Sequence, residues 1–233
     1  TLHHAQGLTG DRIPLVYKQI PPKVSLDDLG ALPIYRGNPQ KKQMSLMINV
    51  AWGTEYLEEI LSILDTNNVK ATFFLDGSWA AKNGNVAKKI VEKGHEIGNH
   101  AYTHPDMAKL GAERTAQEIV RTNDAIQKAT GIRPKLFAPP SGSYNDLTVK
   151  TAHGQGMRTI LWTLDTVDWK RPPAAAILNR IVPKAHNGAL VLMHPTEPTV
   201  TALRTMIPEL GKKGYHLVTV SELLSQERPV PGS

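Results

Sequence analysis

Residues Ser45–Leu75 read SLMINVAWGTEYLEEILSILDTNNVKATFFL. Both ends of this stretch, SLMINVA and ATFFL, are short apolar runs rich in branched and aromatic residues, which is typical of buried strands. Between them, apolar residues recur at helical spacing, at Leu57, Ile60, Leu61 and Leu64. The pattern predicts a strand, a helix and a second strand in succession, which is the unit that builds parallel sheets.

The same alternation continues along the chain. Further apolar runs are EIGNH, KLFA, RTILWTL, ALVLMH and HLVTV. Helical patterns lie between them, in NVAKKIVEKG, AERTAQEIVRTNDAIQKATG, DLTVKTAHGQG and ALRTMIPELGKKG. No glycine-rich nucleotide-binding turn follows any of the runs. We therefore expect an α/β fold, a distorted (β/α) barrel of about seven parallel strands.

The composition predicts one main domain preceded by an arm. Hydrophobic residues make up 40% of the 233 residues, which is enough for a large core. Residues 1–42 are rich in proline among polar residues, and this composition favours an extended N-terminal arm. We expect the barrel domain at residues 43–225 and a C-terminal tail at residues 226–233.

The composition also limits the classes of function. The chain has no cysteine, which excludes disulfides and cysteine-based metal or redox sites. No apolar run approaches the roughly 20 residues that cross a bilayer, and the start, TLHHAQGLTG, lacks the basic and apolar regions of a signal peptide. The net charge of +6 is dispersed along the chain without a nucleic-acid-binding motif, so no nucleic-acid partner is expected.

Polar side chains lie where the predicted strands end. In chain order these residues are Asn49, Asp76, His100, His104, Pro139, Pro140, Asp165, Asp168 and His194. Because active sites of (β/α) barrels lie at the carboxyl ends of the strands, we expect these residues to share one face. His100 and His104 offer two imidazoles that could hold Zn²⁺, although a single histidine or aspartate is more often a satisfied structural group.

Five motifs occur in an order that resembles one protein family. They are NVKATFFLDG, GHEIGNHAYTHPDM, FAPPSGSYND, TLDTVDW and LVLMHP. This series is similar to that of the polysaccharide deacetylases of the NodB type, carbohydrate esterase family four. The resemblance runs from about residue 43 to residue 225, and the proline-rich arm lies outside it.

The resemblance implies metal-dependent removal of N-acetyl or O-acetyl groups from sugar polymers such as chitin or peptidoglycan. In the family, a divalent ion such as Zn²⁺ or Co²⁺ polarises the acetyl carbonyl, an aspartate takes a proton from water, and a histidine protonates the leaving amine. By position, His100 and His104 match the two metal histidines, and His194 matches the general acid.

The remaining motif positions are assigned by the same resemblance. Asp165, Asp168 and Trp169 match the D-x-x-D-W motif, whose aspartate orients and tunes the catalytic histidine. Leu192 is expected to line the pocket for the acetyl methyl group. The other residues expected on the substrate side are Pro139, Pro140 and Tyr144.

The chain departs from the family at two decisive positions. The first family motif, T-F-D-D-G, supplies the catalytic base and a metal aspartate, but here Asn49 stands at the base position and none of the next three residues is acidic. An asparagine accepts hydrogen bonds but cannot take a proton near neutral pH. The arginine that opens the third motif and pairs with the base is Ala138, and Ala101 and Ser141 also replace residues usual in the family.

These departures leave two hypotheses. One is a deacetylase of weak or absent activity, in which Asp76 or Glu55 could replace a lost carboxylate, although a turn and a helix N-terminus explain these two residues as well. The other is a non-catalytic glycan-binding or structural cell-wall protein. Under both we expect an acetylated partner such as peptidoglycan or a chitin-like oligomer, an extracellular or cell-wall location, and anchoring through a segment outside this chain.

Overall fold

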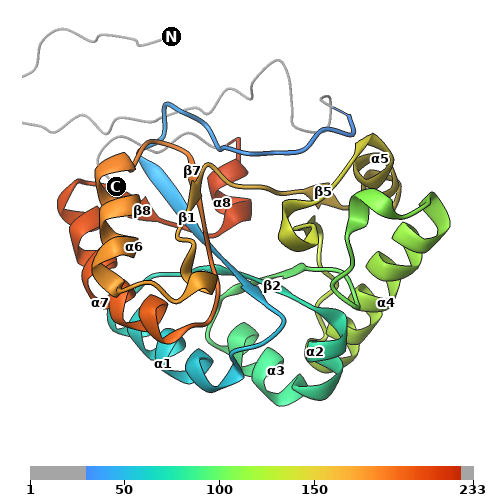
Figure 1. The fold of residues 1–233 in the computed structure, drawn as a ribbon, viewed down its shortest axis with the longest axis horizontal. Helices are drawn as coiled ribbons and strands as arrows, with labels where there is room; N and C mark the ends of the chain where they lie inside the picture. The colour runs from blue at the N-terminus through green and yellow to red at the C-terminus, as the bar shows by residue number, and fades with distance from the viewer. Residues whose placement is uncertain (1–29, 227–233) are drawn as a thin grey trace, which may run out of the picture.

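A computed structural model describes residues 30–226, which form a curled parallel sheet with helices around its outer side (Figure 1). The strands are β1 (Gln43–Val50), β2 (Thr72–Leu75), β3 (Glu96–Asn99), β4 (Leu136–Phe137), β5 (Arg158–Thr159), β6 (Leu164–Asp165), β7 (Ala189–Met193) and β8 (His216–Leu217). They follow the order β5-β4-β3-β2-β1-β7-β6, and β8 pairs with β1. All these pairs are parallel, so the predicted distorted (β/α) barrel is confirmed.

The helices that cover the sheet are α1 (Thr54–Thr66), α2 (Gly77–Lys82), α3 (Gly84–Glu92), α4 (Ala112–Thr130), α5 (Asp146–Gly154), α6 (Ala174–Ile181), α7 (Glu197–Lys212) and α8 (Val220–Leu224). Short 3₁₀ turns are η2 (Met107–Lys109), η3 (Pro140–Gly142), η4 (Asp168–Lys170) and η5 (Val182–Lys184). Within residues 30–226, none of the helices has the length and apolar character that crossing a membrane requires. The predicted arm and tail fall largely on residues 1–29 and 227–233, outside the described part, so their boundaries stay predictions.

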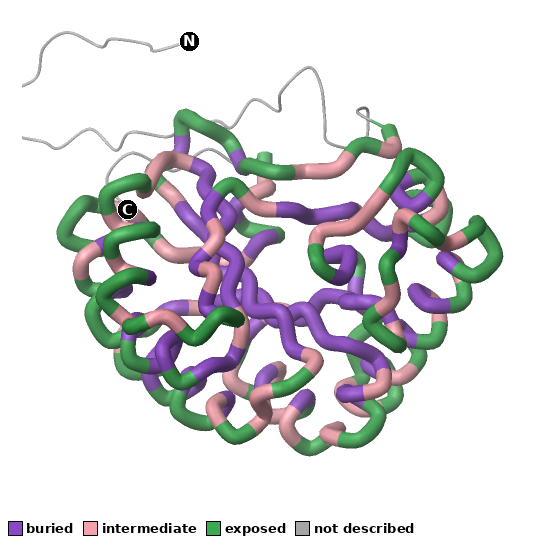
Figure 2. Tube along the Cα trace, viewed as in Figure 1, coloured by how far each residue is buried: buried purple, intermediate pink, exposed green. Residues whose placement is uncertain are grey.

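Strand β1 separates two cores because successive side chains point to opposite faces of the sheet. Met44, Leu46, Ile48 and Val50 are fully buried in the larger core, between the sheet and the outer helices. Met47 points the other way, into a smaller core inside the barrel. Figure 2 shows the buried residues following the strands and the exposed ones following the outer surfaces of the helices. Asn49 therefore points inward, at the end of the strand.

The expected strand Arg158–Leu164 is two short strands in the structure. The Ile160 N–H donates to Phe137 O (2.7 Å), and the Leu161 N–H donates to Ile34 O (2.8 Å). The Thr163 N–H then donates to Leu190 O (3.1 Å), on the other edge of the sheet. The run is extended as predicted, but its hydrogen-bond partners change from β4 and Ile34 to β7. It therefore passes from one end of the strand order to the other.

Helix ends follow the expected chemistry, with one correction. Gly131 ends α4 in the left-handed conformation, as its sequence position predicts. The helix expected from Ala202 instead begins at Glu197, because Thr196 caps it by accepting a hydrogen bond from the Thr199 N–H and Pro198 occupies the first turn. The result places the start of α7 directly after the loop that carries His194.

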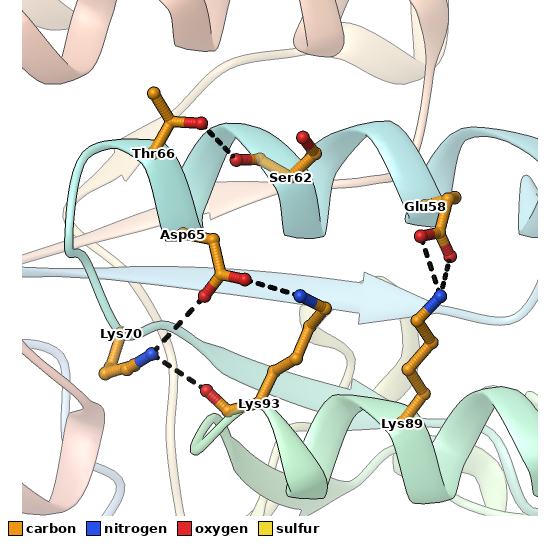
Figure 3. Close-up of polar contacts among 7 residues, drawn as sticks. All are labelled: Glu58, Ser62, Asp65, Thr66, Lys70, Lys89 and Lys93. Atoms are coloured by element: carbon orange, nitrogen blue, oxygen red, sulfur yellow. Dashed lines mark hydrogen bonds and ion pairs between the residues drawn. The ribbon is translucent and has the colours of Figure 1, made fainter.

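Ion pairs join the outer surfaces of α1 and α3 (Figure 3). Lys89 contacts Glu58 with an Nζ–Oε1 distance of 2.7 Å, and Lys93 contacts Asp65. Lys70 lies 3.7 Å from the other oxygen of Asp65 and also donates to Lys93 O (2.8 Å). These side chains are partly exposed, so each pair contributes at most about 1 kcal/mol, and the apolar core beneath them holds the helices.

His95 is a buried histidine outside the predicted site. Its Nδ1 accepts a hydrogen bond from the Ala71 N–H (3.2 Å), and its ring lies edge-on to Phe73. Burial, and after it the positive charge of Lys70, lowers the pKa of His95 to about 4. The folded protein therefore holds this imidazole in its neutral form.

We expect the free energy of unfolding to fall as the pH is lowered from about 6.5 to about 4. In that window His95 binds a proton in the unfolded chain but not in the folded one, so the stability that is complete above the unfolded pKa is lost. Between pH 7 and pH 4.5, His95 lowers the free energy of unfolding by about 2 kcal/mol.

Urea denaturation at pH 7 and pH 4.5 measures this loss. His95→Asn is the matched variant, because its amide oxygen can accept from the Ala71 N–H and does not titrate. Its stability should fall less than that of the natural protein over the same range. An equal fall in the two proteins would contradict the assignment.

Candidate functional site

A cavity of about 460 Å³ lies at the carboxyl ends of the strands. It is lined by Asn49, Ala51, Trp52, His100, His104, Ser141, Trp162, Asp165, Trp169, Leu192 and His194. These residues come from strands β1, β6 and β7, and from the loops that follow β1, β3, β4, β5, β6 and β7. The structure thus brings most of the residues selected from the sequence into one site.

Asp168 anchors one wall of the cavity. It is fully buried, and its Oδ1 accepts from His194 Nδ1 (2.8 Å). Its Oδ2 accepts from the His194 N–H and from Thr199 Oγ1, both at 2.6 Å. Because a carboxylate only accepts, His194 Nδ1 must carry a proton, and Nε2 is the ring nitrogen left for a ligand.

His100 and His104 form the opposite wall. His100 is buried, and its Nδ1 donates to Ala138 O (2.7 Å). The two imidazole rings meet edge to face with centroids 5.1 Å apart. Burial, reinforced by His104, lowers the pKa of His100 to about 3. His104 lies on the loop between β3 and η2, and its backbone is left-handed, with φ 56°.

The end of β1 carries no carboxylate into the cavity. Asn49 is 3% exposed, and its Oδ1 has no hydrogen-bond partner within the protein. Val50 points into the outer core, whereas Ala51 lines the cavity. Ala51 and Trp52 both line the cavity, and when the glycine of T-F-D-D-G is matched to Gly53, these two residues rather than Asn49 stand at the two aspartate positions of that motif.

Other residues selected from the sequence lie outside the cavity lining. Asp76 caps α2, where its Oδ1 accepts from Ser78 Oγ (2.6 Å) and the Trp79 N–H (2.9 Å), and burial raises its pKa. Glu55 is exposed in the first turn of α1. Pro139 and Pro140 start η3, and the Tyr144 hydroxyl pairs with that of Tyr35. Contacts of Pro139, Pro140 and Tyr144 with a substrate stay predictions.

Backbone strain is concentrated in the loops around the cavity. Among residues 30–226, six non-glycine residues have a positive φ. Five of the six belong to these loops: Ala101, His104, Ser141, Val167 and Arg171. Each such residue costs on the order of 1–3 kcal/mol, and such strain is typical of functional sites.

Comparisons with known proteins agree on one family. The sequence profile described as polysaccharide deacetylase matches residues 36–160. An uncharacterized protein of Bacillus subtilis, YlxY, is 49% identical over 92% of this chain and 67% of its own length. A peptidoglycan-N-acetylglucosamine deacetylase of Bacillus cereus is 35% identical over 83% of this chain and 73% of its own length. The chain belongs to the polysaccharide deacetylase family.

A solved structure from the polysaccharide deacetylase family extends the comparison. It is a CE4 family pseudoenzyme from Bacillus anthracis, with a TM-score of 0.88 and 50% identity over 89% of this chain and 74% of that one. A mutant of that protein, described as having restored enzymatic activity, gives the same TM-score at 48% identity. The likeness therefore covers nearly all of the described residues.

The residues present do not fit the metal centre of polysaccharide deacetylases. Across residues 30–226, no three or more histidine, aspartate or glutamate side chains are placed to hold one metal ion. His100 and His104 offer two nitrogens, but Asn49 and Ala51 add no carboxylate. Two neutral imidazoles without an anionic ligand should hold a divalent ion weakly.

Sequence reasoning missed three contributors to the site. Trp52 was counted only as a residue without a carboxylate, and Trp162 only as part of an apolar run, yet both line the cavity. Thr199 completes the hydrogen bonds of Asp168 from the first turn of α7. Their positions depend on loop conformation, although the exposed placement of a tryptophan directly after a strand was a usable signal for Trp52.

We expect Asp168→Ala to lower the free energy of unfolding by about 3 kcal/mol, because three buried donors lose their acceptor. Asp165→Ala is the matched control, since Asp165 is half-buried and accepts a hydrogen bond from the Val167 N–H (2.8 Å). Its loss should be about 1 kcal/mol. Urea denaturation of both variants measures the difference. Equal losses would show that the Asp168 cluster does not stabilise the fold as described.

Proposed function

We propose that this chain binds N-acetylated cell-wall glycan, such as peptidoglycan or a chitin-like oligomer, and deacetylates it slowly or not at all. One observation carries the proposal. At the carboxyl end of β1, where the family places its carboxylates, the cavity receives the methyl group of Ala51 and the indole of Trp52, beside the amide of Asn49. The cavity is present, although the two carboxylates that the T-F-D-D-G motif would supply are not.

The chemistry supports low activity. Hydrolysis of an acetamide needs a base that takes a proton from water and an acid that gives one to the leaving amine. His194 can hold a proton and deliver it from Nε2, but neither Asn49 nor Ala51 can act as the base. General base catalysis typically contributes about 10²- to 10⁴-fold, so the absence of the base removes a large part of the rate.

A compensated enzyme is the second candidate, and Asp165 is the observation in its favour. Asp165 is the one carboxylate among the residues that line the cavity. Its Oδ1 accepts from the Val167 N–H, and its Oδ2 is the atom that could take a proton. Asp76 and Glu55 give no such support, because neither lines the cavity.

The nature of the glycan and the location of the protein are inferred from the family and from charge. Relatives that share a third of the sequence are named as peptidoglycan deacetylases. The net charge of +6 would favour an anionic surface such as a cell wall. We therefore propose that the protein acts outside the cytoplasm, at or near the wall.

The natural protein should bind N-acetylglucosamine oligomers or peptidoglycan fragments without releasing acetate faster than its His194→Ala variant. Calorimetry measures the binding, and an acetate assay with added Zn²⁺ or Co²⁺ measures the reaction. Release that depends on His194 and is lost in Asp165→Asn would favour the compensated enzyme. Absence of glycan binding by the folded protein would contradict the proposal.

We expect activity to appear when both carboxylates are introduced, as Ala51→Asp with Trp52→Asp. The first supplies a base and the second an anionic ligand beside His100 and His104, so acetate release should rise about 10²-fold or more. The related pseudoenzyme whose mutant is described as having restored activity supports this expectation.

The two single variants are the controls for this experiment. Trp52→Asp alone should raise the affinity for Zn²⁺ without acetate release, and Ala51→Asp alone should change neither strongly. His194→Ala in the double variant should abolish the gained activity. If the folded double variant binds Zn²⁺ but releases no acetate, the chain lacks more than these two carboxylates.

A further inference from the structure

Tryptophan is concentrated at the cavity. The chain has four tryptophans, and three of them, Trp52, Trp162 and Trp169, line this one site. Trp52 is 41% exposed and Trp169 is 53% exposed, whereas Trp79 is buried. Large exposed aromatic side chains gathered at a cavity indicate a surface that binds an apolar face of a ligand.

The structure holds Trp52 in a fixed orientation. Its indole stacks on the His194 imidazole, with centroids 5.7 Å apart and planes inclined by 11°. Gly53 follows with φ 78°, and a Cβ atom there would lie 2.1 Å from Pro195 O. The loop after β1 therefore packs closely against the loop after β7. His194 covers one face of the indole. The exposed part of Trp52 is its opposite face and edge.

Asn49 supplies an unused polar group in the same cavity. Its side chain is buried, and Oδ1 lacks a hydrogen-bond partner in the protein. An unpaired buried acceptor is unfavourable, so the site favours a ligand that brings a donor. The amide N–H of an acetamido group is such a donor, and a sugar hydroxyl is another.

The charges of the cavity indicate which part of a glycan it accepts. No lysine or arginine is among its lining residues, and Asp165 is its one carboxylate. A carboxylate-bearing sugar would therefore meet a like charge without a compensating cation. Leu192 adds an apolar surface suited to a methyl group. Together these features favour a neutral N-acetylated hexosamine.

We propose that Trp52 is the main sugar-binding platform of this cavity. Its free indole face packs against the apolar face of an N-acetylated hexosamine ring, and Asn49 Oδ1 accepts a hydrogen bond from the acetamido N–H of that sugar. The inference rests on the proposed glycan-binding function, and it assigns the contact to a residue of the loop after β1. In this arrangement Trp52 and His194 act as a rigid stacked pair.

The test measures binding of a neutral N-acetylglucosamine tetramer by calorimetry. Trp52→Ala should weaken binding about tenfold or more, since buried tryptophan contacts dominate such interfaces. Trp52→Phe keeps an aromatic face and should stay within about threefold of the natural protein. Leu147→Ala removes another exposed apolar side chain, on α5 and outside the cavity lining, and should leave binding unchanged.

Two further measurements separate direct contact from an indirect effect on His194. The tetramer should change the tryptophan fluorescence of the natural protein, and this change should shrink in Trp52→Phe although binding persists. Asn49→Leu should weaken binding of the acetylated tetramer, whereas Asn49→Asp, which keeps an acceptor, should not. The fully deacetylated tetramer should bind the natural protein more weakly than the acetylated one.

The outcomes distinguish this inference from the proposed function. If the natural protein binds the tetramer and Trp52→Ala binds it equally well, Trp52 is not the platform, and glycan binding still stands. If Asn49→Leu binds as tightly as the natural protein, the amide contact is refuted. If the folded natural protein binds neither the tetramer nor peptidoglycan fragments, both the proposed function and this inference are overturned.

Discussion

The two-faced geometry of strand β1 is the constraint on which the rest of the structure depends. The strand pairs with β2, β7 and β8, and its side chains alternate between the outer core and the barrel interior. A shift of β1 by one residue would turn inward every apolar side chain that this strand places in the outer core. The position of Asn49 in the cavity is therefore fixed by the packing of β1.

Much of the fold could be predicted because it depends on local periodicity. Apolar runs and helical stripes alternate regularly enough to indicate parallel strands and a barrel. The division of Arg158–Leu164 could not be predicted, because the change of partner at Ile160 and Leu161 depends on Ile34, far away in the sequence. The early start of α7 does not follow from its apolar stripe, because it depends on the cap that Thr196 forms with the Thr199 N–H.

The candidate site was predictable to the extent that it lies on strand ends. Asn49, His100, Leu192 and His194 face the cavity because strand direction and alternation place them there. Tyr144 and Trp52 lie on loops, and their positions are set by contacts with Tyr35 and with His194, which no sequence pattern reveals. Ala51 rather than Val50 lines the cavity because it continues the alternation that turns Asn49 inward.

The Asp168 cluster explains how His194, which the family resemblance assigns as the general acid, can persist in a site without the family's base. Removing His194 would leave a buried carboxylate with fewer donors, so the pair is stabilising whether or not it catalyses a reaction. Other features of the site destabilise the protein instead of stabilising it. Left-handed residues such as Ala101 and Val167, an unpaired Asn49 oxygen and exposed indoles all cost stability, and none of them holds the barrel together. Their concentration around one cavity is what a ligand-binding site requires, and it favours a site that still binds over an inert remnant.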